Sequence, residues 1–509
     1  MSIFKNIFGK KKESGQPSPS KPRFYAPDFD KYNEFGQIVT IFDYTLNPDF
    51  AIANKAAETI YRLFNSVQVF KNKELYETFR YLRINKTDIK KFDRFDKEIK
   101  ITLLCIASMN GNGYSREEAL KRLLELQTQR TIPFILFRVA DWVAPIRKTA
   151  EIAIQKLLVA KNTTYFIQNH KLISWLLQVQ RTDLSVLYNQ IINSVTQKRL
   201  APEQLKRLKG GDRFFYFKSL AKKGLLDNEL INQMQTDKYY LIRILLIKHF
   251  DIVTNKKAVL IKLLTDKSQK VRQGAVNLIE KQEVNEYETV LRGLIFDKST
   301  SVRVEARRLL NKICDCDFVK IYQESISNQK QIIGSILGLS EVSDKSKIPL
   351  IEKYLDSDRA RIKTASLIGI YNLDSNIGTE KAYQILETEK PVSTRRAAES
   401  LLAKQGIDFK RLRKLYDLTD STGKKIILRL FNQFSGWSVA GDFLKALTDN
   451  DKKIQLMARV FLESWNNYTI RLATNQNPED KDYVLSWYKK TIEMGIKVPG
   501  NIPFIFGEK

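Results

Sequence analysis

Residues 258–279, AVLIKLLTDKSQKVRQGAVNLI, decide the fold of this chain. An apolar run is followed by a polar turn that contains Asp266, and a second apolar pattern begins at Val271. In that second pattern the apolar residues stand at positions i, i+4, i+7 and i+8, which is one face of an α-helix. The stretch therefore predicts a hairpin of two helices, and Ala275 lets a neighbouring helix approach the second one closely.

The same hairpin recurs about every thirty residues. An aliphatic residue followed by arginine marks its second helix at four places: Ile146-Arg147, Ile242-Arg243, Val271-Arg272 and Val302-Arg303. Weaker copies of this mark follow at Ile332, Ile362, Thr394, Ile426 and Ile454. A fixed period in this range is typical of stacked-repeat proteins. We therefore predict an all-α fold in which hairpins stack side by side along one continuous core.

An acidic residue stands six positions before each of these arginines. The pairs are Asp141 and Arg147, Asp237 and Arg243, Asp266 and Arg272, and Asp297 and Arg303. A carboxylate in the turn can accept hydrogen bonds from the free amides that begin the second helix. It can also receive an arginine from its own repeat or from the adjacent one. We interpret these eight residues as a structural ladder, and we find no such pair in the repeats of Ile332, Ile362, Ile426 and Ile454.

This combination resembles the HEAT-repeat family of α-solenoids, in which such aspartates and arginines form a ladder along the stack. The resemblance covers roughly residues 131–465 and implies a right-handed α-solenoid of HEAT-like helical hairpins. The stretch 138–150, RVADWVAPIRKTA, is similar to bacterial HEAT-repeat proteins that have no assigned activity. The resemblance therefore implies a fold and supplies no chemistry.

Composition and pattern divide the chain into five parts. We expect a basic amphipathic segment at 1–12, a flexible linker at 13–23, irregular helical N-terminal repeats at 24–130, the HEAT-repeat solenoid at 131–475, and a capping helix with a tail at 476–509. Within the third part, the run from Ser115 to Glu118 fits a capping box and predicts a helix that ends at Leu126.

The N-terminal segment has the make-up of a membrane anchor. Apolar residues on one helical face precede a lysine cluster, a pattern that suits an anionic membrane surface. The residues are Ile3, Phe4, Ile7, Phe8, Lys10, Lys11 and Lys12. The alternatives are a disordered tail and a helix docked on the first repeat.

The expected compartment follows from the absence of a predicted transmembrane helix or signal peptide and from the small number of cysteines. No apolar run approaches the length of a transmembrane helix, and the N-terminus lacks the apolar core of a signal peptide. The three cysteines in this long chain favour a reducing compartment without a disulfide framework. We therefore expect a cytoplasmic protein that contacts the inner membrane face as a peripheral protein.

The formal net charge is +28, from 85 basic and 57 acidic side chains, and it predicts an acidic partner. A protein, a nucleic acid or an anionic membrane would fit, whereas solvated helix faces are the alternative explanation. Two basic clusters supply the candidate partner-binding residues Lys206, Arg207, Lys209, Arg213, Arg396, Lys410, Arg411, Arg413 and Lys414. Consecutive aromatic residues at 214–217 interleave with the first cluster, and we expect most of them in the core.

Catalytic patterns are scarce. The chain has two histidines, His170 and His249, and it lacks the common phosphate-binding, zinc-binding and nucleophile motifs. Asp141 and Trp142 resemble the aromatic–carboxylate sites of HEAT-like alkylpurine DNA glycosylases. Here the aspartate belongs to the ladder, and we expect Trp142 to begin an apolar helix. We predict no catalytic residue, no bound metal and no cofactor.

These observations favour a non-enzymatic HEAT-repeat scaffold that binds an acidic macromolecule, with a protein as the preferred partner. The alternative is a nucleic-acid-binding HEAT-like protein, glycosylase-like or regulatory, that uses a basic concave groove.

Overall fold

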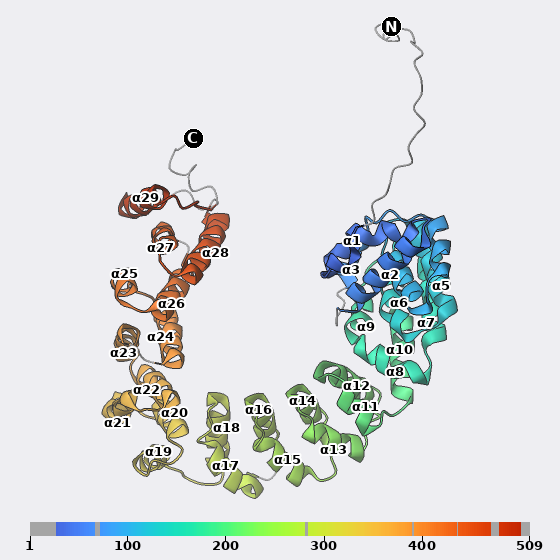
Figure 1. The fold of residues 1–509 in the computed structure, drawn as a ribbon. Helices are drawn as coiled ribbons and strands as arrows, with labels where there is room; N and C mark the ends of the chain where they lie inside the picture. The colour runs from blue at the N-terminus through green and yellow to red at the C-terminus, as the bar shows by residue number, and fades with distance from the viewer. Residues whose placement is uncertain are drawn as a thin grey trace, which may run out of the picture. The chain divides into compact units, whose positions relative to one another are not determined.

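The computed structural model describes residues 27–66, 72–279, 284–388, 391–434, 436–469 and 478–499 (Figure 1). These residues form α-helices and short 3-10 helices, and no strand occurs among them. The chain is an all-α solenoid of HEAT-like helical hairpins, as predicted. The anchor candidates Ile3, Phe4, Ile7, Phe8, Lys10, Lys11 and Lys12 and the linker 13–23 lie outside the described residues.

The chain divides into two compact units, Met1–Ile242 and Arg243–Lys509, and the boundary falls inside α14 (Tyr240–Lys248). The first unit contains α-helices that range from 4 to 16 residues in length. They are α1 (Ile38–Ile41), α2 (Phe50–Asn65), α3 (Asn72–Phe79), α4 (Lys97–Ala107), α5 (Gly113–Leu126), α6 (Ile132–Arg138), α7 (Ala144–Leu157), α8 (Thr163–Gln168), α9 (His170–Leu176), α10 (Ser185–Gln197), α11 (Pro202–Arg207), α12 (Gly210–Lys222) and α13 (Asn228–Thr236).

The second unit continues with more regular hairpins. Its helices are α15 (Lys256–Leu264), α16 (Gln269–Leu278), α17 (Glu288–Leu294), α18 (Thr300–Leu310), α19 (Phe318–Ser327), α20 (Ile332–Val342), α21 (Ile348–Glu352), α22 (Ala360–Leu373), α23 (Ser375–Glu387), α24 (Val392–Gln405), α25 (Phe409–Leu418), α26 (Ser421–Phe431), α27 (Trp437–Leu447), α28 (Lys452–Thr469) and α29 (Pro478–Glu493).

The stretch at 258–279 forms the hairpin α15–α16. Val271 and Ala275 are fully buried, and α16 packs against both α15 and α18. The corresponding residues of α18, Val302 and Ala306, are equally buried. A core shared by neighbouring hairpins therefore holds this unit together, as stacked repeats require.

The last helix, α29, packs against α27 of the same unit. Its apolar face includes Val484 and Tyr488, which are buried. Asn477, the residue before it, lies outside the described part of the chain, as do residues 500–509. No helix in the described part of the chain is long and apolar enough to span a membrane.

Two local predictions about helix starts are wrong. Helix α5 begins at Gly113 with Asn112 as its N-cap, because the Asn112 side chain accepts the amide of Tyr114, whereas the Ser115 hydroxyl donates to the buried carbonyl of Ile84. Trp142 does not begin a helix: α7 starts at Ala144, and the Trp142 side chain is 77% exposed in the turn. The prediction that α5 ends at Leu126 is confirmed.

One local disulfide occurs, although the cysteines form no framework of several bridges. Cys314 and Cys316 follow α18 and are joined by a disulfide, since the turn brings their Cα atoms to 5.5 Å. Cys105 is a free, buried thiol in α4.

Candidate functional site

Each of four aspartates in the turns accepts two hydrogen bonds from an arginine of the preceding hairpin. Arg272 binds Asp297 with Nε–Oδ2 at 2.6 Å and Nη2–Oδ1 at 2.8 Å. The same two-point contact joins Arg116 to Asp141, Arg213 to Asp237 and Arg243 to Asp266, at 2.6–3.0 Å. We call each such arginine–aspartate contact a rung. Rungs are charge-assisted and largely shielded from solvent, so they fix the spacing of successive hairpins.

The six-residue spacing read in the sequence has a different structural meaning. The Nη1 group of Arg272 donates to the main-chain oxygen of Asp266 at 2.7 Å, and Arg147 does the same to Asp141 at 2.8 Å. Arg303 donates in the same way to the main-chain oxygen of Asp297, so these three ladder arginines each bind the backbone of their own turn. The carboxylate of that turn serves the preceding hairpin, 23–25 residues away along the chain.

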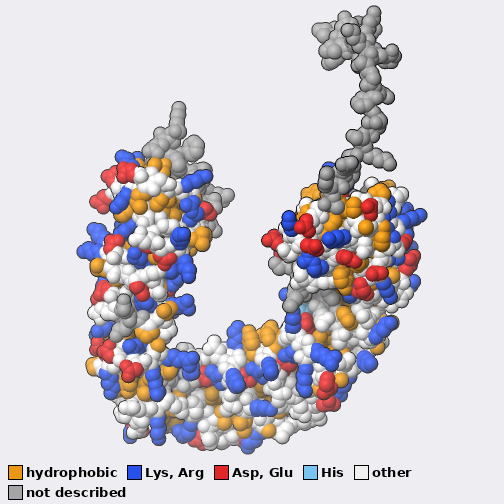
Figure 2. All heavy atoms as spheres, in the orientation of Figure 1, with side chains coloured by type: hydrophobic (Ala, Val, Ile, Leu, Met, Phe, Trp, Pro, Cys, Tyr) orange, Lys and Arg blue, Asp and Glu red, His pale blue; other side chains and the backbone are white. Residues whose placement is uncertain are grey.

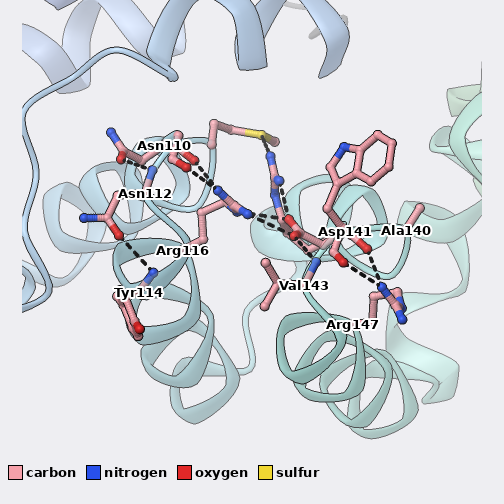
Figure 3. Close-up of polar contacts among 12 residues, drawn as sticks. Asn110, Asn112, Tyr114, Arg116, Ala140, Asp141, Val143 and Arg147 are labelled. Carbon is pink, nitrogen blue, oxygen red and sulfur yellow. Dashed lines mark hydrogen bonds and ion pairs between the residues drawn. The ribbon is translucent and has the colours of Figure 1, made fainter.

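The turn at Asp141 is the most buried rung (Figure 3). Arg116 and Arg138 both point at its carboxylate, with Arg138 Nη1 at 2.6 Å from Oδ2, while the amide of Val143 donates to Oδ1 at 3.0 Å. The Asp141 side chain is 1% exposed. The Asp141 carboxylate therefore cannot reach a substrate. A glycosylase-like site formed by Asp141 and Trp142 would need an accessible carboxylate, which this turn does not offer.

Trp142, next to this rung, is covered by a cation. The guanidinium of Arg181 lies 3.8 Å from the centre of the Trp142 ring, and its Nη1 donates to the main-chain oxygen of Ala140. Such a contact holds an exposed indole in place.

Two further contacts, which we also call rungs although one has lysine in place of arginine, occur where the sequence showed no acid–arginine pair. Arg395 binds Asp420 in the turn before α26, with Nη1–Oδ1 at 2.6 Å. Lys424 binds Asp449 in the turn before α28 at 2.7 Å. The repeats of Ile426 and Ile454 thus lack the six-residue pair within the turn, but each has a turn carboxylate whose basic partner comes from the hairpin before. A search at a spacing of about 25 residues would have found both rungs.

The nine basic candidates fall into two groups. Arg213, Arg411 and Arg413 already bind carboxylates of this chain: Asp237, the pair Glu380 and Glu387, and Asp442. The hydrogen bonds that Arg411 donates to Glu380 and Glu387 raise the pKa of Arg411. These three arginines are structural and have no unpaired charge for a partner.

The other six candidates are exposed, and no ion pair joins them to another residue of the described chain. They are Lys206, Arg207, Lys209, Arg396, Lys410 and Lys414. On the face drawn in Figure 2, the lysines and arginines of each unit are interspersed with acidic side chains and do not form one unbroken stripe.

The aromatic residues of the first basic cluster are mostly core, as expected. Phe215, Tyr216 and Phe217 are buried, and the Tyr216 hydroxyl accepts the amide of Leu200 at 3.0 Å. Beside them lies a groove of about 480 Å³ between α11, α12 and α13. Its walls include Pro202, Leu205, Lys206, Phe217, Gln233 and Lys238.

The described residues form few arrangements that could catalyse a reaction or bind a metal ion. Among them, no three His, Cys, Asp or Glu side chains gather in a metal-binding arrangement. His170 contacts Asp212 at 3.1 Å and packs on the ring of Phe215. That histidine therefore serves the packing of α9 against α12.

No protein-family model matches this sequence, and no curated protein matches it. Solved structures that it resembles include a mutant of Kap121p (11% identity, TM-score 0.30) and Kap121p bound to Ste12p (11% identity, TM-score 0.23), matched over 90% and 93% of this chain. A chain from a study of cadherin and beta-catenin matches at 12% identity over 89% of this chain and 99% of its own length, with a TM-score of 0.20. The chain spans 62% and 55% of the two Kap121p chains. The fold assignment rests on the hairpins and rungs described above.

Proposed function

We propose that the protein is a non-enzymatic HEAT-repeat scaffold that binds an acidic protein partner. The observation that carries this proposal is the division of the charged residues. Arginines of the rungs are bound by turn carboxylates, whereas exposed cations such as Lys206, Lys238 and Lys298 have no ion pair with any other described residue. A stack whose hairpins are joined by buried ion pairs and whose surface carries unpaired cations suits an anionic macromolecule.

The groove between α11, α12 and α13 gives the first unit a candidate contact. Leu205 and Phe217 supply apolar walls, while Lys206 and Lys238 are exposed cations at its edge. Asp237 also lines it, but that carboxylate is already bound by Arg213. A peptide with acidic residues beside an apolar anchor would gain from both kinds of wall.

The test uses a partner that is captured from the native host, identified and then purified. Lys206→Glu combined with Lys238→Glu should weaken its affinity at least about tenfold, since two attractive contacts become repulsive. Lys222→Glu combined with Lys223→Glu changes the same charge at the exposed end of α12 and should leave affinity near that of the wild type. If both pairs of substitutions lowered the affinity equally, the groove would be rejected as the partner-binding site.

Nucleic acid binding is the alternative outcome of the same test. It requires that DNA or RNA be the purified ligand and that the logarithm of affinity fall linearly and steeply with the logarithm of salt concentration. Charge reversal at Arg411 or Arg413 is unsuitable here, because both arginines hold the second unit together.

We also propose that residues 1–12 place this cytoplasmic scaffold on the inner membrane surface. The proposal rests on sequence alone: apolar residues on one helical face are followed by lysines. Ile7→Asp combined with Phe8→Asp should release the full chain from vesicles that contain phosphatidylserine. Unchanged vesicle binding would discard the anchor.

A further inference from the structure

The ladder has a gap in the second unit. In rungs such as those of Asp266 and Asp297, the aspartate stands three residues before the first residue of its helix. Gln329 occupies that place before α20, and Ser357 occupies it before α22. The Ser357 hydroxyl still accepts the amide of Arg359 at 3.2 Å, as the aspartates do, but it carries no charge. Two successive turns therefore lack a carboxylate at the rung position, although Asp356 and Asp358 flank Ser357 in the second of them.

The arginine that would bind an acid at Gln329 has another partner. Arg303 is 1% exposed and donates to Glu341, near the end of α20, with Nε–Oε2 at 3.2 Å. Arg307 binds the same carboxylate at 2.8 Å and the hydroxyl of Tyr322 at 2.9 Å. Both buried guanidiniums of α18 therefore bind the same carboxylate of α20, so the hairpin packing does not depend on an acid in the turn.

A pocket of about 610 Å³ lies at this gap. Three exposed cations line it: Lys298 in the turn before α18, and Arg359 and Arg361 at the start of α22. No ion pair joins any of the three to the described residues, and the described residues that line the pocket include no aspartate or glutamate. Its apolar walls come from Phe296, Ile332, Ile333 and Ile362. The second unit thus has a positive, partly apolar cavity where its neighbours in the ladder have a carboxylate.

We propose that this pocket binds an acidic segment of the partner protein, whose carboxylates take the place of the missing turn aspartates. The inference rests on the proposed function, since the ligand belongs to the acidic partner. The intact rungs show that this kind of turn is occupied by carboxylates. The isoleucine and phenylalanine walls match apolar side chains that alternate with acidic ones in a peptide. A phosphodiester backbone has nothing apolar to place there.

The probe is a fluorescein-labelled peptide of twelve residues in which Asp and Glu alternate with Leu and Ile. Its matched control has Asn and Gln in place of the acids. Binding to the full chain is measured by fluorescence anisotropy. Lys298→Gln, Arg359→Gln and Arg361→Gln together should weaken binding of the acidic peptide at least about tenfold.

A second variant tests the position of the gap. Gln329→Glu adds one carboxylate to the pocket wall without a change in size, so the chain supplies the acid itself. We expect binding of the acidic peptide to weaken several-fold while the melting temperature stays the same or rises. The control is Arg396→Gln, Lys410→Gln and Lys414→Gln, which removes the same charge from exposed positions of the same unit. It should change affinity less than about twofold.

Three results would overturn the proposal: no binding of the acidic peptide to the wild type, an equal loss in the control triple, or equal binding of the Asn and Gln peptide. Binding of a DNA duplex that depends on the three gap cations, in place of the peptide, would also overturn it. These failures are separate from a failure of the proposed function, which is tested with the purified partner at Lys206 and Lys238 of the first unit.

Discussion

At the scale of single residues, Asp141 shows how a rung is stabilised. Burial by itself raises the pKa of the Asp141 carboxyl, but the hydrogen bonds from Arg116, Arg138 and the Val143 amide, with the charge of Arg138, hold that pKa below its ordinary value. Burial lowers the pKa of Arg138 to about 10, so this arginine stays charged at neutral pH. One carboxylate is therefore shared by two buried cations.

Asp141→Ala should lower the free energy of unfolding by about 3–5 kcal/mol, because Arg116 and Arg138 would remain buried without a counter-charge. Urea denaturation followed by circular dichroism measures the change. The control is Asp43→Ala, an exposed carboxylate in the same unit, which should change stability by about 0.5 kcal/mol or less. If Asp141→Ala lowered the free energy of unfolding no more than the control does, the contacts of Asp141 with Arg116 and Arg138 would add no net stability.

The contribution of Asp141 should also depend on pH. Its pKa in the folded state lies below that in the unfolded chain, so the stabilisation is fully present above the unfolded value of about 3.9. It is lost as the pH falls through the folded-state pKa. The stability difference between the wild type and Asp141→Asn should accordingly be constant above about pH 5 and shrink as the pH falls below about 4. A difference that also stays constant at the lower pH would show that the carboxylate is not the titrating group.

The aspartates and arginines of the ladder could be picked out from sequence, but their pairing could not. A spacing of six residues is visible by eye, and it corresponds to a bond with the backbone of the same turn. The ion pairs join residues about 25 positions apart, and this distance varies with the length of each hairpin. For that reason Arg213 looked like a surface cation, although it is the rung partner of Asp237.

At the scale of helices, a glycine lets α20 pack closely against the tyrosine ring of α19. A Cβ atom on Gly338 would lie 2.3 Å from Cζ of Tyr322 in α19. The hydroxyl of that tyrosine donates to the carbonyl of Ile295 at 2.8 Å and accepts from Arg307. The glycine therefore lets one ring connect three helices.

Gly338→Ala should destabilise the second unit by about 1–3 kcal/mol, since the methyl group would displace the Tyr322 ring. Gly293→Ala in α17 is the matched control, because a Cβ there meets no atom within 4 Å. Its stability should equal or slightly exceed that of the wild type. Calorimetry of both variants checks the difference, and similar melting temperatures would contradict the packing argument.

Helix pairs could be predicted wherever the aliphatic and alanine pattern is regular, as in α15–α18. Between Ile146 and Ile242 the chain forms short helices such as α8, α9 and α11, each of six or seven residues. Helices of this length show too few turns for a periodic pattern to emerge. The sequence alone therefore left this region without placed repeats.

At the scale of the whole molecule, the excess positive charge and the rungs should respond differently to salt. Exposed charges are screened beyond about 10 Å at 0.1 M salt, whereas half-buried pairs are screened much less. We expect the association rate with the purified acidic partner to fall at least about tenfold between about 0.05 and 0.5 M NaCl, while the melting temperature changes little. Stopped-flow fluorescence and calorimetry provide the two readings. A melting temperature that falls in parallel with the rate would locate the salt-sensitive charges in the rungs.

Because every rung joins one hairpin to the next, an internal duplication or excision of one full period leaves a guanidinium facing an acid wherever the next turn also carries its aspartate, which excludes the turn of Gln329. Lengthening or shortening of the array by whole modules is tolerated there, as Arg243 would meet Asp297 if the module between them were lost. The exception is the module that begins at α18: its two guanidiniums depend on Glu341, so excision of α20 would strand both. Lineages that carry shorter or longer versions of this array should keep α18 and α20 together.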